Sequence, residues 1–320
     1  MRRIYWESVS AHEYLLSVPT FTEFIHYQYR AMHDQLTECA QNAERDENAP
    51  AFTSEALYAQ PEDAPHTSEE TLNMAARIIV AGLGIRVRQH VGALALTYAP
   101  SDPAPEWGGI PFDVRECWPG SAAFTIARSV LEGVSSACWI LAPSAEPVTR
   151  LRRVACIELW SAYNNDMAGM QPSMLPSTRD LVQGAGFDIS EKNNRQPGLK
   201  EGDGRPLSFS YQVAVREVFD QEGVAWYKRW SGRAHHALWA SRNTIGYQEE
   251  ARDAGPGFSF KSSMEVPAHV DLASNMASVL ARYVDDMATF YGRTFDGTAL
   301  HNQAAFLKTK AAEARAATAG

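Results

Sequence analysis

Residues 223–242 (GVAWYKRWSGRAHHALWASR) concentrate side chains that could act on a phosphate group. Within them, Arg229 and Arg233 closely precede two adjacent histidines, His235 and His236. A histidine of ordinary pKa can accept or donate a proton near neutral pH. An arginine stays charged and can hold two phosphate oxygens at once. These residue types could cleave RNA without a metal, because a base could take the 2′-OH proton and an acid could protonate the leaving 5′-oxygen.

Helical geometry divides this segment into two polar faces, because successive residues point about 100° apart. One face carries Tyr227, Ser231 and His235, and another carries Arg229, Arg233 and His236. The histidine that would act with Arg229 is therefore left open. A histidine among aromatic residues is also often a hydrogen-bonded core residue, so a purely structural role stays open too.

A second polar stripe lies in residues 121–141, which otherwise read as a hydrophobic core helix. Arg128 and Glu132 are spaced i, i+4 and can pair on one helix face. Ionic groups on so apolar a helix need partners. They form either a structural ion pair or part of a functional site. Because each stripe can satisfy the other, we predict that Arg128 or Glu132 reaches Tyr227, Ser231 or His235.

The elements that must position these residues are almost all helical. Apolar residues recur at three- and four-residue spacing, which predicts an all-α bundle of about seven to nine helices. The predicted helices are 20–46, 69–98, 121–141, 145–168, 208–220, 223–242, 268–293 and 297–316. Thr67-Ser68-Glu69-Glu70 predicts a capped helix start, and Pro147 suits a first turn. Residues 44–70, 100–120 and 184–205 are predicted loops, and only 256–264 alternates like a strand.

Composition limits the functions that this chain can have. The 320 residues include 38 acidic and 29 basic side chains, giving a net charge of −9. Nucleic acid could therefore bind only at a local basic cleft, to which Arg150, Arg152 and Arg153 could contribute. The four cysteines form no CxxC pair, so a disulfide scaffold or zinc site is not expected. With no signal peptide and no long apolar run, we expect a cytoplasmic protein that does not enter membranes.

The motifs in both helices resemble those of a group of uncharacterised bacterial all-helical proteins. That group shares an R-x-x-x-E helix, matched here by Arg128 to Glu132, then an apolar Trp-Leu-x-x-Pro ending and an Arg-rich helix. It later carries Y-(R/K)-x-(L/W)-S-(G/A)-x-A-H, matched position by position from Tyr227 to His235. The similarity covers residues 120–170 and 208–242. The group in turn resembles the HEPN superfamily of abortive-infection and toxin–antitoxin systems.

The resemblance implies a HEPN-like four-helix core over residues 101–320, with an N-terminal helical extension over residues 1–100; the two could form one continuous domain. It implies a homodimer, a metal-independent endoribonuclease or RNA-binding function in phage defence or stress response, and an antitoxin or defence partner. Catalytic roles would fall to Arg229, His235, His236, Arg128 and Glu132, and substrate binding to Tyr227, Ser231 and Arg233. Trp230 stands where HEPN proteins usually carry a polar residue after the arginine. No cofactor or metal is expected.

Two alternatives to RNA chemistry remain. A non-catalytic helical interaction module would use the same polar residues structurally. A Mg²⁺-dependent enzyme resembling terpene cyclases would use the tandem Asp285-Asp286, although exposed helical carboxylates are the simpler interpretation. Gly82-Leu83-Gly84 is only a fragment of a dinucleotide fingerprint, because Val87 replaces its third glycine. It predicts a close helix–helix contact instead.

Overall fold

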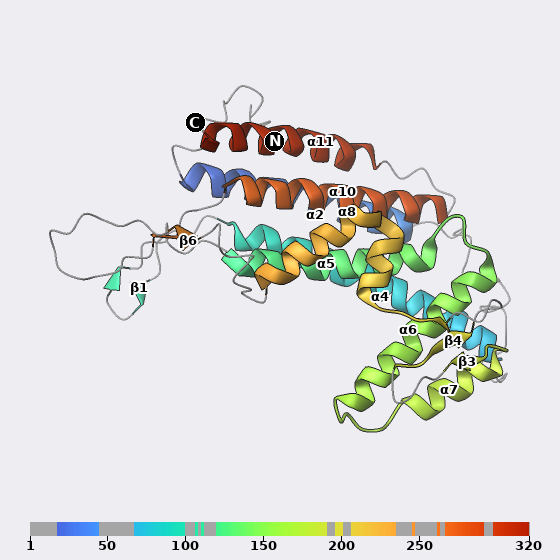
Figure 1. Cartoon of the computed structure of the whole chain (residues 1–320). Coiled ribbons are helices and arrows are strands. Elements are labelled where there is room, and N and C mark those ends of the chain that lie inside the picture. The colour runs from blue at the N-terminus through green and yellow to red at the C-terminus, as the bar shows by residue number, and fades with distance from the viewer. Residues whose placement is uncertain are drawn as a thin grey trace.

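The protein is a mostly helical bundle in the computed structural model (Figure 1). The structure describes residues 18–44, 67–99, 106–107, 110–111, 120–190, 196–200, 206–234, 245–246, 261–262, 266–290 and 297–319. Its helices are α2 (Val18–Glu44), α4 (Ser68–Thr97), α5 (Gly120–Leu141), α6 (Pro147–Met167), α7 (Leu175–Gly184), α8 (Tyr211–Ala234), α10 (Val266–Phe290) and α11 (Thr298–Ala319). The described part therefore holds eight helices, which confirms a multi-helix all-α bundle.

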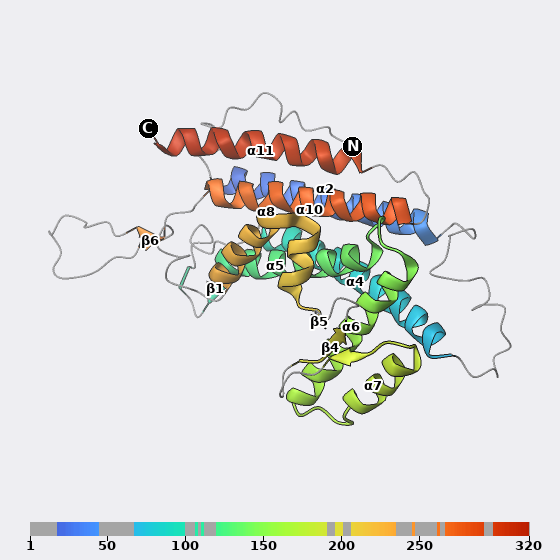
Figure 2. The ribbon, with the colours of Figure 1, turned by 45° about the vertical axis from the view of Figure 1, so that its right-hand side comes forward.

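The helices form one main stack with a smaller lobe at one end. Figures 1 and 2 show α11 above α10 and α2, with α4, α5 and α8 below them. The main core lies inside this stack and includes Tyr29, Leu94, Leu131, Trp230 and Leu280, all nearly inaccessible to solvent. A second core lies where the N-terminal half of α4 meets α6 and α7. Burial of these apolar faces is the main force that holds the helices together.

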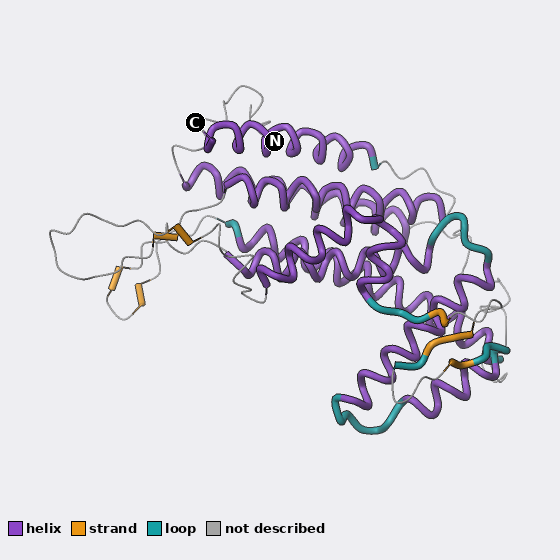
Figure 3. The backbone as a smooth tube through the Cα atoms, in the orientation of Figure 1, coloured by secondary structure: helices purple, strands orange, loops and turns teal. Residues whose placement is uncertain are grey.

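Seven short strands accompany the helices in the described part of the chain (Figure 3). They are β1 (Glu106–Trp107), β2 (Ile110–Pro111), β3 (Ile189–Ser190), β4 (Gly198–Lys200), β5 (Pro206–Leu207), β6 (Ile245–Gly246) and β7 (Lys261–Ser262), with β3, β4 and β5 in one sheet. That sheet is antiparallel, and Leu199 of β4 lies opposite both Ile189 and Leu207. These apolar residues pack on the second core beside α6.

Two predicted helix starts are confirmed in detail. The Thr67 hydroxyl accepts a hydrogen bond from the Glu70 backbone, and the Glu70 carboxylate accepts one from the Thr67 backbone. This reciprocal capping box satisfies amide groups that have no partner within the helix. Helix α6 begins at Pro147, where the missing proline N–H is no loss.

Helix α8 is broken at Asp220, as the separate predictions for 208–220 and 223–242 require. Asp220 has φ 53° and ψ −147°, which lies outside the helical region. Gly223 makes the turn after the break compact, because a Cβ there would lie 2.3 Å from Cβ of Phe219. The break lets the two halves of α8 follow different directions over α5 (Figure 2).

Replacing Asp220 by glycine should stabilise the fold by on the order of 1 kcal/mol. A non-glycine residue pays a steric cost at this φ, and glycine removes that cost. Urea unfolding should show a higher midpoint with an unchanged m-value. Asp180→Gly, within helix α7, serves as the control and should destabilise the protein by about 1 kcal/mol. A destabilised Asp220→Gly variant would contradict the strain assigned to the break.

The segment 256–264 contains β7, as its strand-like alternation predicts, but the prediction that it was the only such segment was wrong. The predicted loop 184–205 contains β3 and β4, and helix α7 was not predicted at all. Strands of two or three residues are too short to show alternation. The sequence around the start of α7 is typical of a loop, because it contains Pro172 and Pro176. Helices α2 and α4 share the main core with α5 and α10. The division at residue 100 and the HEPN-like core stay predictions.

Candidate functional site

Arg128 of α5 joins the two helices that the sequence singled out. Its Nε donates to Oε1 of Glu132 at 2.8 Å. Its two terminal nitrogens donate to the Tyr227 hydroxyl at 3.2 Å and to the Ser231 hydroxyl at 3.3 Å, both on α8. The guanidinium also lies over the Tyr227 ring, 5.2 Å from its centre. These four residues are named the Arg128 cluster, and their contacts confirm the predicted packing of α5 against α8.

The Arg128 cluster is largely withdrawn from water. The Arg128 and Glu132 side chains are 24% and 15% exposed. Burial, followed by the negative charge of Glu132, raises the pKa of Tyr227 above its ordinary value. The same two causes raise the pKa of the nearby Tyr211, at the start of α8. Both phenols therefore stay protonated at neutral pH and act as neutral hydrogen-bonding groups.

A second contact ties the first half of α8 to α5. The indole Nε1 of Trp139 donates to Oε2 of Glu217 at 2.6 Å. Arg153 of α6 donates to the Trp139 carbonyl at 2.5 Å, and its other terminal nitrogen reaches Glu217 at 3.4 Å. Helix α8 is thus held by polar contacts on both sides of its break, which fixes the orientation of the half that carries Arg229.

The two other predicted arginines of α8 lie apart from Tyr227 and Ser231. Arg229 is exposed, and on a helix it points about 200° away from Tyr227 and from Ser231. The Arg233 guanidinium lies over the Phe124 ring of α5, 4.4 Å from its centre. His235 and His236 lie outside the described residues. The structure therefore brings Arg128, Glu132, Tyr227 and Ser231 together and places Arg229 on a different face.

The three arginines of α6 each contact an aromatic ring, and their contribution to a basic cleft stays a prediction. Each guanidinium lies over a different aromatic ring: Arg150 over Phe290, Arg152 over Phe187 and Arg153 over Trp139. Burial lowers the pKa of Arg150 and of Arg153, although both stay cationic at neutral pH. Their hydrocarbon stems and planar heads serve packing in the smaller lobe and around Trp139.

Sequence reasoning missed a buried histidine network beneath α8. His269 of α10 is almost fully buried, and its Nδ1 shares a 2.5 Å hydrogen bond with the hydroxyl of Tyr98, the C-cap residue of α4. Burial, with a smaller contribution from the positive charge of Arg233, lowers the pKa of His269 to about 3. The Tyr98 ring stacks on Tyr29. His269 stood alone at the start of a predicted helix, and no nearby residue in the sequence signalled its partners.

The tandem aspartates of α10 have separate roles. Asp285 lies 2.8 Å from Nε2 of His301 on α11. Asp286 is only 5% exposed, and its two carboxylate oxygens share the Nε–H of Arg282, each at 2.9 Å from the nitrogen. The interpretation of both as exposed carboxylates was therefore wrong for Asp286. Across the described ranges, no group of three His, Cys, Asp or Glu side chains could hold a metal ion.

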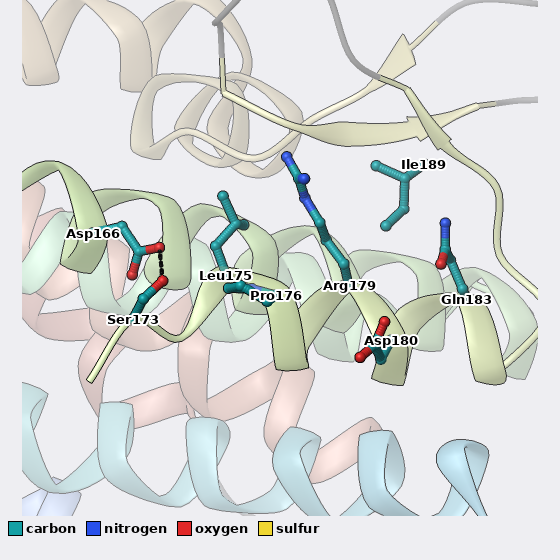
Figure 4. A pocket seen from close by; sticks show the side chains of 8 residues that line it. All are labelled: Asp166, Ser173, Leu175, Pro176, Arg179, Asp180, Gln183 and Ile189. Atoms are coloured by element: carbon teal, nitrogen blue, oxygen red, sulfur yellow. Dashed lines mark hydrogen bonds between the residues drawn. The ribbon is translucent and has the colours of Figure 1, made fainter. Parts of the chain in front are cut away.

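A hollow of about 420 Å³ lies between the end of α6, helix α7 and strand β3 (Figure 4). Its charged lining residues are Asp166, Arg179 and Asp180. The Asp166 carboxylate already accepts hydrogen bonds from the Ser173 hydroxyl at 2.5 Å and from the Met174 backbone at 2.9 Å, and these bonds lower its pKa. Asp166 therefore ties the end of α6 to the loop that leads into α7.

Comparison with known proteins gives no match that bears on function. Any functional conclusion therefore rests on the contacts described above. A scan against protein-family models finds no match. Searches of curated proteins and of solved structures find no significant match either. The resemblance to HEPN proteins stays a prediction that rests on the motifs around Arg128 and Tyr227.

Proposed function

We propose that this chain is an RNA-directed helical protein, a HEPN-like metal-independent endoribonuclease or RNA-binding relative in phage defence or stress response. One observation carries the proposal: the Arg128 cluster fixes the half of α8 that presents Arg229 and leads directly to His235 and His236. Lys228 and Arg229 are both exposed there. A fixed, exposed pair of cations that two histidines follow in the sequence is suited to a phosphate backbone.

The proposal gives the two arginines different roles. Arg229 would bind a phosphate, while His235 or His236 would take the 2′-OH proton. The 2′-oxygen would then attack phosphorus, the bond to the 5′-oxygen would break, and an imidazolium would protonate that leaving oxygen. Arg128 donates to three partners within the protein and so acts as a positioning residue for α8.

Cleavage of a labelled single-stranded RNA in EDTA tests this proposal. His235→Ala and His236→Ala should identify the histidine, because only the one that transfers protons should abolish cleavage. Arg229→Ala should lower the rate by about 10²-fold or more, as expected for a lost phosphate contact in the transition state. A 2′-deoxy substitution at the cut site should block the reaction.

The matched control is Arg216→Ala, which removes an exposed cation from the first half of α8. It should leave cleavage unchanged. Loss of wild-type cleavage in EDTA, or equal cleavage of DNA, would contradict the metal-independent mechanism. Equal loss of activity in Arg216→Ala would contradict a site localised at the distal end of α8.

A second candidate function is a non-catalytic helical interaction module. The observation in its favour is that the Arg128 cluster is satisfied internally, as a structural bridge between α5 and α8 would be. This function predicts neither RNA binding nor RNA cleavage by the pure protein. The cleavage assay and an RNA-binding titration therefore separate the two candidates.

A further inference from the structure

Helix α4 carries an exposed apolar stripe on the side away from the second core. Met74, Ile78 and Ile85 are 41%, 65% and 48% exposed, and Ala81 between them is exposed as well. Their spacing of i, i+4, i+7 and i+11 places all four on one face of the helix. A single exposed apolar side chain is ordinary, but a continuous stripe of this kind is typical of an interaction surface.

The stripe is accessible to a second helix. The opposite face of the same segment packs on the second core through Leu72, Ala76 and Val80, so the outer face is the one left open. A Cβ built at Gly82, beside the stripe, would have nothing within 4 Å. Small side chains at Ala81 and Gly82 would let another helix backbone approach closely.

The charges beside the stripe determine the direction of the partner. Glu70 and Arg88 are about five full turns apart and so lie on the same flank of the stripe. When two copies of a helix pack antiparallel through the same face, identical flanks meet. Glu70 of each copy then lies beside Arg88 of the other copy. In a parallel arrangement this flank would instead face the flank of Thr71 and Gln89, and no charge pairs would form.

We propose that α4 is a self-association surface, on which a second copy of this chain packs antiparallel. Met74 then faces Ile85 of the partner, and Ile78 faces Ala81 of the partner. Two symmetric Glu70–Arg88 pairs border this apolar seam. The interface is self-complementary, as a two-fold dimer requires. It does not depend on the RNA function, since none of these residues belongs to the Arg128 cluster or to the distal half of α8.

A lipid surface is the other occupant that the stripe could attract. Helix α4 is the one helix in the described ranges whose length and composition would let it cross a membrane, and 28% of its most apolar window is buried. A bilayer would take up the apolar residues but would bring no carboxylate to Arg88, whereas an antiparallel second copy brings its Glu70 to that flank. Charge complementarity therefore favours a second copy of the chain.

Sedimentation equilibrium of the full chain at micromolar concentrations tests the proposal. The wild type should sediment as a dimer, and Ile78→Glu should raise the dimer dissociation constant by at least about 100-fold by placing two carboxylates in the seam. Met167→Glu is the matched control, because Met167 is 70% exposed at the end of α6 and should leave the dimer unchanged. A monomeric wild type, flotation of the wild type with phosphatidylcholine–phosphatidylglycerol vesicles, or a dimer unaffected by Ile78→Glu would each overturn the proposal.

Cross-linking then tests the direction of packing. A mixture of Met74→Cys and Ile85→Cys proteins should give a covalent dimer containing one copy of each with a short bis-maleimide. Either protein alone should cross-link no more than the wild type, whose own cysteines set the background. Preferential cross-linking of Met74→Cys to itself would show a parallel pair and overturn the antiparallel arrangement.

Discussion

Replacing Arg128 by methionine is expected to lower the free energy of unfolding by about 2–3 kcal/mol. The substitution removes three hydrogen bonds of Arg128, one to Glu132 within α5 and two to Tyr227 and Ser231 on α8. It also leaves the mostly buried Glu132 carboxylate without its cation. Methionine preserves much of the side-chain volume, so the loss reports the polar contacts rather than a cavity. Urea unfolding followed by circular dichroism measures it.

Two comparisons make this result specific. Arg315→Met removes the exposed ion pair with Asp271 and should cost under about 1 kcal/mol. A double-mutant cycle between Arg128→Met and Tyr227→Phe should give a coupling energy of about 0.5–1.5 kcal/mol across the helix interface. An Arg128→Met protein as stable as the wild type would show that the cluster does not hold α8 in place.

Lowering the pH from 7 to 5 is expected to cost about 2 kcal/mol of stability through His269 alone. The folded protein holds the pKa of His269 at about 3, against an ordinary value of 6.5. Between pH 3 and 6.5, His269 is protonated in the unfolded chain but neutral in the folded protein. Stability is therefore fully present above about pH 6.5 and falls as the pH drops towards 3. The groups that surround the imidazole are the Tyr98 hydroxyl, the Phe124 ring and the cationic Arg233.

The His269→Phe variant isolates this contribution. It should be less stable than the wild type at neutral pH, because the Tyr98 hydrogen bond is lost. Between pH 7 and 5, however, its free energy of unfolding should fall by about 2 kcal/mol less than that of the wild type. Equal pH slopes for the wild type and His269→Phe would contradict the neutral buried imidazole.

Most of the helical framework could be predicted because its signals are local. Each signal is contained in a short stretch of sequence. Examples are the capping box at Thr67, the proline at the start of α6 and the apolar periodicity of α5. The small sheet could not be predicted, because its strands acquire their pairing only when Leu199 meets Ile189 and Leu207. Helix α7 likewise owes its start to a cap from Asp166 of the preceding helix.

The contact between α5 and α8 could be predicted, because each helix carries a polar stripe that the other can satisfy. Arg128 and Glu132 on one apolar helix required polar groups nearby, and Tyr227 and Ser231 were the matching pair. Arg229 lies apart from this cluster because residues two positions apart point to nearly opposite sides of a helix. The motif, read as a string of residues, does not show this. Burial of His269 and of Asp286 depends on how whole helices meet, so neither could be read from neighbouring residues.

We propose that Arg229 contacts an RNA phosphate while Arg128 positions the helix that carries it. Fluorescence anisotropy of a labelled single-stranded RNA over a range of salt concentrations tests this claim most directly. The account predicts that Arg229→Ala weakens binding and lowers the slope of log affinity against log salt by about 0.7, the value for one phosphate contact. Its unfolding free energy should stay unchanged. An Arg229→Ala protein with wild-type affinity and salt slope, or a wild type that binds no RNA, would contradict the account.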